Sequence, residues 1–147
     1  MNIRRLLLVE DNAQDRLLTL RALKGINIVD AVDVVRDGVE ALDYLFARGA
    51  HSARDAADLP SAVLLDIGLP KLSGLEVLER IRAAASTQHL PVVMLTSSDD
   101  PQDVSTSYAF GANSYVRKPL AAAEFTAAVA QLGRYWLELN HPLVCPE

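Results

Sequence analysis

The sequence predicts an α/β fold: a doubly wound, five-stranded parallel sheet flanked by five helices. Short apolar runs alternate with segments whose apolar residues recur at helical spacing, a pattern typical of a parallel sheet covered on both faces. Half of the 147 residues are hydrophobic, which is enough for one domain with a proper core. No internal repeat or low-complexity linker interrupts this alternation.

The first third of the chain is expected to form two strands and two helices. The strand from Leu6 to Val9 is apolar at every position, so it is buried on both faces. A helix follows from Ala13 to Lys24, with Gly25 as its stop. The second strand runs from Ala31 to Val35, and Asp37 caps the next helix. Side chains expected to point inward from the two helices are Leu17, Leu20, Leu23, Val39, Leu42, Leu45 and Phe46.

The rest of the chain continues the alternation after a polar stretch from Ala47 to Leu59. Pro101 suits the first position of the fourth helix, whereas Ala121 offers no capping side chain to the last one. The remaining strands are expected at Ala62 to Leu65, Val92 to Leu95 and Ser114 to Val116, and the remaining helices are expected to begin near Ser73, Pro101 and Ala121.

Composition restricts the partners and the compartment of the protein. A net charge of −5 argues against a nucleic-acid surface, which needs a clustered basic face. The single cysteine, Cys145, excludes an internal disulfide framework and suits a reducing cytoplasm. The apolar stretch from Leu6 to Val9 is too short for a signal peptide, and no run is long enough to span a membrane. We therefore expect a cytoplasmic protein.

Polar side chains follow the apolar runs where four of the predicted strands end. Glu10 and Asp11 follow the first strand, Asp66 the third, Thr96 the fourth and Lys118 the fifth. In open α/β sheets the carboxyl ends of the strands form the edge at which ligands bind. We therefore expect three carboxylates, one hydroxyl and one ammonium in a single cleft.

Such a cleft favours a bound cation and a phosphate. Two carboxylates about 4 Å apart repel each other by roughly 4 kcal/mol at an effective dielectric constant near 20. A hard cation relieves this repulsion, and Mg²⁺ fits best because carboxylate and carbonyl oxygens are its preferred protein ligands. The metal, lysine and hydroxyl together would bind phosphoryl oxygens, whose transfer depends mainly on positioning and charge neutralisation.

Four segments contain these polar residues: LLLVEDN, LLDIGLPKLSG, VVMLTSSDD and GANSYVRKPL. In these segments the chain resembles the receiver domain of two-component response regulators, and the resemblance covers almost its whole length. Any one of the motifs is weak alone, but all of them occur in the family's order and at its intervals. The resemblance implies a flavodoxin-like receiver fold and Asp66 as the phosphoacceptor that attacks a phosphohistidine on a sensor histidine kinase.

The resemblance also implies roles for the other matching residues. Asp11, Asp66 and the Gly68 carbonyl would hold Mg²⁺, with Glu10 acting through water. Lys118 would pair with one phosphoryl oxygen, and Thr96 would hydrogen-bond another.

Two further implications concern the fifth strand. Tyr115 matches the switch aromatic that turns inward as Thr96 moves toward the phosphoryl group. The peptide bond between Lys118 and Pro119 would be cis, a form found almost only before proline.

Two alternatives remain open at this point. One is a Mg²⁺-dependent aspartyl-phosphate phosphohydrolase resembling the haloacid dehalogenase group, which places a second Asp two residues after the nucleophile. Here Gly68 occupies that position, so a general acid is lacking. The other is a phosphorylation-independent, receiver-like binding module, against which the complete set of site residues argues.

The end of the chain bears on partners. We expect a receiver domain at residues 1–137 and a tail at 138–147, which leaves no room for an output domain. Action through protein contacts is then expected, including a homodimer through the last strand, final helix and tail. The strings SYVRKP and YWLEL look like those of single-domain regulators that partner phytochrome-type histidine kinases.

Overall fold

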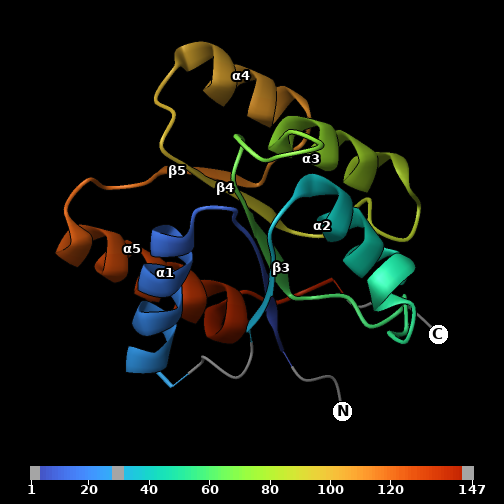
Figure 1. Ribbon diagram of the computed structural model, residues 1–147, viewed down its shortest axis with the longest axis horizontal. Helices are drawn as coiled ribbons and strands as arrows, with labels where there is room; N and C mark the ends of the chain where they lie inside the picture. The colour runs from blue at the N-terminus through green and yellow to red at the C-terminus, as the bar shows by residue number, and fades with distance from the viewer. Residues whose placement is uncertain (1–3, 28–31, 144–147) are drawn as a thin grey trace.

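The computed structural model describes residues 4–27 and 32–143 and contains one parallel sheet in the order β2-β1-β3-β4-β5 (Figure 1). The chain leaves β1 toward β2, then crosses to the other side of β1 to form β3, so a topological switch point lies between β1 and β3. This order confirms the predicted doubly wound sheet. Ala31, the predicted first residue of the second strand, lies outside the described residues. The strands are β1 (Leu6–Val9), β2 (Val32–Val35), β3 (Ala62–Leu65), β4 (Val92–Thr96) and β5 (Ser114–Arg117).

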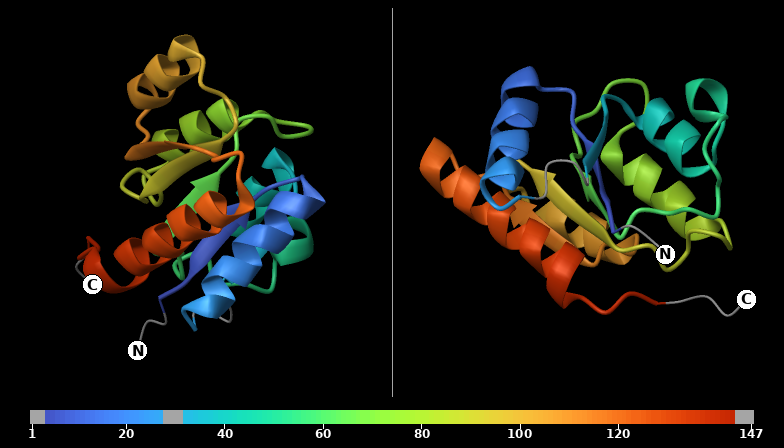
Figure 2. Two further views of the ribbon diagram at one scale, coloured as in Figure 1. Left: turned by 90° about the vertical axis from the view of Figure 1, so that its left-hand side faces the viewer. Right: turned by 90° about the horizontal axis from the view of Figure 1, so that it is seen from below.

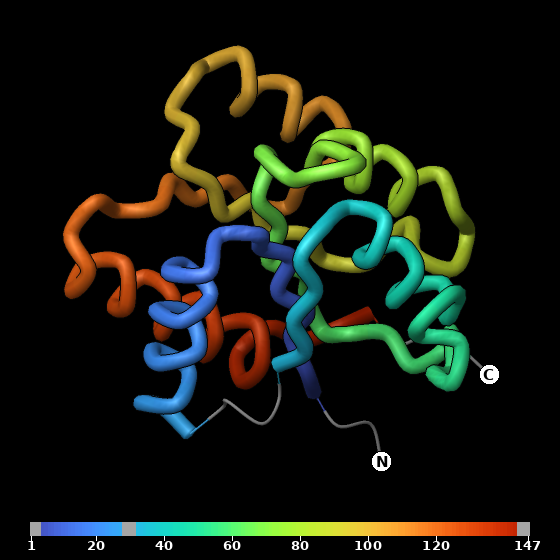
Figure 3. Tube along the Cα trace, viewed as in Figure 1, coloured from blue at the N-terminus to red at the C-terminus, as the bar shows by residue number. Residues whose placement is uncertain are grey.

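Helices cover both faces of the sheet (Figure 2). The two helices from opposite ends of the sequence, α1 and α5, lie side by side on one face (Figure 3). On the other face α2 packs on α3, and α3 contacts α4. No helix in the described part of the chain is both long and apolar enough to cross a membrane. The helices are α1 (Ala13–Gly25), α2 (Gly38–Leu45), α3 (Gly74–Ala83), α4 (Pro101–Ala109) and α5 (Ala122–Arg134).

The sheet has a separate hydrophobic core on each face, because successive side chains of a strand point to opposite sides. In β1, Leu7 and Val9 pack under α2 and α3, whereas Leu6 and Leu8 pack under α1 and α5. All four are buried, as the continuous apolar run predicts. A rigid, doubly covered sheet therefore supports the residues that follow its strands.

Side chains cap the first four helices. Each cap accepts a hydrogen bond from a backbone N–H of the first helical turn, which otherwise has no partner within the helix. The helix α5 begins after Ala121 without a side-chain cap, in agreement with the sequence. The capping residues are Asn12, Asp37, Ser73 and Asp100.

Two of the side chains predicted to point inward are exposed. Leu17 on α1 is 50% exposed, and Val39 on α2 is also exposed. Leu23 is buried as predicted, and Thr19 is buried beside it on α1, where its hydroxyl donates to the Asp15 carbonyl at 2.7 Å. Because its hydroxyl has a partner within the helix, the polar side chain of Thr19 can be buried.

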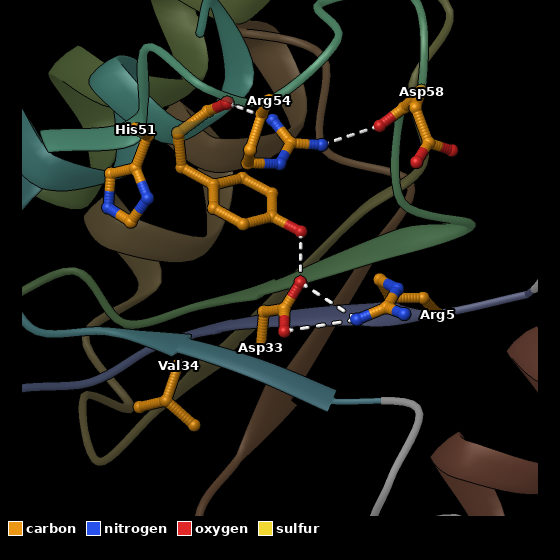
Figure 4. Close-up of a pocket in the computed structure, with 7 residues that line it drawn as sticks. Arg5, Asp33, Val34, His51, Arg54 and Asp58 are labelled. Carbon is orange, nitrogen blue, oxygen red and sulfur yellow. Dashed lines mark hydrogen bonds and ion pairs between the residues drawn. The ribbon is translucent and has the colours of Figure 1, made fainter. Parts of the chain in front are cut away.

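The polar stretch after α2 folds against the edge of the sheet and borders an open hollow of about 440 Å³ (Figure 4). The Arg54 guanidinium lies 3.7 Å above the ring of Tyr44 and donates to the carbonyls of Tyr44 and Asp58. Asp33 on β2 accepts from the Tyr44 hydroxyl and from Arg5 at 3.1 Å. Burial and the neighbouring Asp33 raise the pKa of Tyr44 to about 12. These contacts hold the stretch, with its short 3₁₀ helix η2 (Gly49–His51), on the edge strand.

The helix α5 continues into a π-helical turn, η3 (Tyr135–Leu139), across the predicted boundary between domain and tail. Trp136 and Leu137 are buried, and Arg4 donates to the Leu137 carbonyl at 2.8 Å. Leu139 and Leu143 are exposed. Cys145 lies outside the described residues.

Candidate functional site

The sheet register brings the predicted site residues together. Val9 pairs with Leu65, so Glu10 and Asp66 are the next residues on two neighbouring strands. Thr96 ends β4 beside Arg117 of β5, and Lys118 follows directly. The expectation of one polar cluster at the carboxyl ends of the strands is confirmed.

Lys118 is the centre of this cluster. Its side chain is only 7% exposed, and its ammonium donates to Glu10 Oε1, to Asp15 Oδ2 at 2.9 Å and to Asp66 Oδ2 at 2.9 Å. A lysine ammonium has three N–H donors. Each of the three donors therefore has a carboxylate partner.

Three carboxylates in the cluster can hold a cation. Glu10, Asp11 and Asp66 each offer one oxygen, and these oxygens lie within 4.8 Å of one another. An all-oxygen ligand set suits Mg²⁺ or Mn²⁺ rather than zinc. Gly68 is exposed beside the cluster, and its N–H donates to Asp66 Oδ1 at 3.4 Å. The oxygen ligands of this cluster therefore fit the predicted Mg²⁺.

Backbone contacts fix the segments that carry these carboxylates. Gly74 approaches the carbonyl of Asp66 so closely that a Cβ at this position would lie 2.0 Å from its oxygen. Only glycine fits there without moving the backbone. On the other side, Arg16 donates to the carbonyls of Glu10 at 3.1 Å and Asp11 at 2.7 Å. These contacts hold the segments after β1 and β3 in place.

The charges in the cluster shift the pKa values in different directions. Burial raises the pKa of Glu10 to about 7, although Lys118 opposes this shift. Burial also opposes ionisation of Asp66, but the hydrogen bond and charge of Lys118 outweigh it, so the pKa of Asp66 is lowered. Burial alone would lower the pKa of Lys118, but hydrogen bonds to the three carboxylates raise it above its ordinary value.

The raised pKa of Glu10 predicts a pH dependence of stability in the absence of divalent cations. Between pH 4.5, the ordinary pKa, and about 7, the folded chain binds more protons than the unfolded chain. Glu10 therefore lowers the free energy of unfolding by about 3 kcal/mol as pH rises through this window. Asp66 acts in the opposite sense, because its lowered pKa removes stability only as pH falls below its ordinary value of 3.8.

Urea denaturation in EDTA between pH 4.5 and 7.5 measures this effect. Glu10→Gln is expected to remove the decline, whereas Glu79→Gln, at an exposed position of α3, is expected to retain it. The same slope in all three proteins would show that the pKa of Glu10 is not raised in the folded protein.

Thr96 and Tyr115 lie beside the cluster. Thr96 is buried, and its hydroxyl is among the groups that lower the pKa of Asp66. The Tyr115 hydroxyl donates to the carbonyl of Ser98 at 2.8 Å, which joins β5 to the segment before α4. The Ser98 hydroxyl donates to Asp103 at 2.6 Å. Thr96 and Tyr115 are therefore linked through this segment.

The structure corrects one prediction for this region and adds two residues. No cis peptide bond occurs among residues 4–27 and 32–143, so the predicted cis bond between Lys118 and Pro119 is wrong. Trans is the more stable form even before proline, and a motif does not fix the isomer. Asp15 and Arg16 were not predicted to belong to the site. The only sequence signal for Asp15 is its place in the first turn of the predicted helix, four residues after Asp11.

Sequence comparisons place the chain among signalling proteins. The model of the response regulator receiver domain matches residues 6–130. The probable methanogenesis regulatory protein FilR2 of Methanothrix harundinacea is 38% identical over 92% of this chain and 84% of its own length. Response regulator Rcp1 of Synechocystis is 34% identical over 90% of this chain and 88% of its own length.

Solved structures agree with this result. The Mn²⁺-bound form of response regulator Rcp1 is similar to this chain with a TM-score of 0.87 and 32% identity, over 96% of this chain and 99% of that one. Bacteriophytochrome response regulator RtBRR gives a TM-score of 0.75 and 47% identity, over 96% of this chain and 84% of that one. The fold, the acidic cluster around Lys118 and these similarities lead to one conclusion: the chain belongs to the response regulator receiver domain family.

Proposed function

We propose that Asp66 is the phosphoacceptor of this response regulator and receives a phosphoryl group from the phosphohistidine of a sensor histidine kinase. The observation that carries this proposal is the position of the Asp66 carboxylate. It lies 2.9 Å from the Lys118 ammonium and within 4.8 Å of oxygens of Glu10 and Asp11. An attacking carboxylate thus has an ammonium on one side and a set of metal ligands on the other.

The chemistry follows from this arrangement. A carboxylate oxygen of Asp66 attacks the phosphorus, the phosphorus–nitrogen bond breaks, and the imidazole leaves with that electron pair. The product is an acyl phosphate on Asp66. Lys118 neutralises one phosphoryl oxygen, and the hydroxyl of Thr96 donates to another.

Mg²⁺, when bound, neutralises negative charge on the transferred group. Asp11, Asp66 and the Gly68 carbonyl would hold it, with Glu10 acting through water. In support, the three carboxylates converge and Gly68 lies two residues beyond Asp66.

The contact between Tyr115 and Ser98 supports a proposal for signal output. A shift of Thr96 toward the phosphoryl group would move the segment that contains Ser98, which Tyr115 holds through its carbonyl. Tyr115 would then change position with Thr96 as the predicted switch residue. The changed surface of α4 and β5 would act on other proteins in the cytoplasm rather than on nucleic acid.

Similarity to bacteriophytochrome response regulator RtBRR and to the phosphorylated cyanobacterial phytochrome response regulator RcpA supports a phytochrome-type kinase as the partner. We also propose a homodimer through the last strand, α5 and η3. The apolar surface at the end of the chain supports it, since Tyr135, Leu139 and Leu143 are exposed. Sedimentation at high micromolar concentration tests this proposal, and a monomer with and without phosphodonor would reject it.

Incubation with acetyl phosphate tests the proposed function. In Mg²⁺ the protein is expected to gain the mass of one phosphoryl group, and in EDTA it is expected to gain none. Steady turnover of p-nitrophenyl phosphate would instead support a phosphohydrolase. Such an enzyme needs a general acid two residues after the nucleophile. Gly68 at this position has no side chain to donate a proton, which argues against that outcome.

A further inference from the structure

Asp15 is the least buried of the three carboxylates that contact Lys118. Its side chain is 26% exposed, compared with 2% for Glu10 and 12% for Asp66. It lies in the first turn of α1, where its backbone N–H donates to the capping side chain of Asn12 at 2.9 Å. A carboxylate near a helix N-terminus is stabilised by the helix dipole. Asp15 is thus fixed in position and open to water.

Asp15 also differs from Glu10 and Asp66 because it does not belong to the group of carboxylates that can share a cation. The oxygens of that group come from Glu10, Asp11 and Asp66. A cation would draw on Glu10 and Asp66, the other two partners of Lys118. Of the three partners of Lys118, Asp15 would then be the one that interacts with Lys118 and not with the cation.

This arrangement creates a competition for Lys118. All three N–H donors of its ammonium are in use, so a phosphoryl oxygen on Asp66 can be bound only if one carboxylate gives up its hydrogen bond. Asp15 can do so at the least cost, because it is the partner that water can most readily solvate. Its negative charge also opposes the arrival of an anion.

We propose that Asp15 is a positioning residue that holds Lys118 in the unphosphorylated site and yields it to the phosphoryl group. This inference rests on the proposed role of Asp66. Asp15 thereby weakens the binding of a phosphoryl group or its analogues, and the loss of its charge strengthens that binding by acting through Lys118.

Calorimetric titration with beryllofluoride, an analogue of the phosphoryl group, at saturating Mg²⁺ tests the inference. Asp15→Asn keeps the shape of the side chain and removes its charge. We expect about tenfold tighter binding, equivalent to about 1.4 kcal/mol. Glu79→Gln removes an equal charge from an exposed site on α3 and is expected to bind as the unaltered protein does.

A double variant separates the role of Asp15 from a general effect of charge. In a Lys118→Met background, Asp15→Asn is expected to change the affinity by less than about twofold, because the two residues act as a pair. Unchanged or weaker beryllofluoride binding by the Asp15→Asn single variant would overturn the inference. An equal gain in affinity from Asp15→Asn in the Lys118→Met background would also overturn it. Circular dichroism confirms that each variant is folded. If the unaltered protein failed to bind beryllofluoride, the proposed role of Asp66 would fail instead.

Discussion

Asp66→Asn is expected to abolish phosphoryl uptake from acetyl phosphate and from a phosphorylated histidine kinase. The amide nitrogen and oxygen of asparagine do not form a stable acyl phosphate. Glu10 also contacts Lys118 and belongs to the candidate metal cluster, but its side chain is only 2% exposed, compared with 12% for Asp66, so a donor reaches Asp66 more readily. Asp66 lies 2.9 Å from Lys118 and also belongs to the candidate metal cluster. Intact-protein mass spectrometry after incubation in Mg²⁺ measures the loss.

The fold of Asp66→Asn is expected to be retained. Lys118 keeps Glu10 and Asp15 as partners, and asparagine has nearly the same shape as aspartate. Asp58→Asn is a matched control, because Asp58 is exposed and lies on the polar stretch at the edge of the sheet. This control is expected to be labelled normally. Normal labelling of Asp66→Asn would show that another carboxylate is the acceptor.

Lys118→Ala is expected to have the largest effect on stability while still allowing phosphoryl uptake. Without the ammonium, Glu10, Asp15 and Asp66 lose their shared counter-ion in a largely buried site. Breaking a buried ion pair by removing one partner costs about 4 kcal/mol of unfolding free energy. Urea denaturation at pH 8 in EDTA measures this loss, and Mg²⁺ is expected to restore a large part of it.

The same variant is expected to separate labelling from response. Asp66 remains available to attack a phosphodonor. One phosphoryl oxygen then lacks its positive partner, so phosphorylation is expected to cause a smaller movement of Thr96 and Tyr115. Arg117→Ala serves as the control, because Arg117 is exposed and pairs only at the surface with Asp99. A Lys118→Ala protein as stable as this control in EDTA would contradict the electrostatic account of the site.

Much of the site could be predicted because strand ends are visible in the sequence. Each apolar run predicts a buried strand, and the next polar residue marks its carboxyl end. In a parallel sheet all such ends meet at one edge, which is why Glu10, Asp66 and Lys118 were expected to meet and do.

Asp15 could not be found in this way because it lies on a helix. Whether it reaches Lys118 depends on the angle at which α1 leaves the sheet, which no local pattern specifies. The exposure of Leu17 has a similar cause. A leucine stripe shows that a helix has an apolar side, but its orientation depends on how α1 and α5 pack.

The polar stretch after α2 shows a different limit. Its residues are too polar to predict burial, yet Arg54 stacks on Tyr44 and fixes the stretch against α2. Hydrogen bonds to backbone carbonyls carry no sequence signature, so only the structure reveals this contact.

A crystal structure of the protein with Mn²⁺ and beryllofluoride tests the central claim most directly. We expect one metal ion bound by Asp11, Asp66 and the Gly68 carbonyl, beryllofluoride on an Asp66 oxygen, and Lys118 in contact with a fluorine atom. The anomalous signal of Mn²⁺ locates the metal independently of the refined coordinates. A metal ion away from the acidic cluster, or beryllofluoride on a different side chain, would contradict the account.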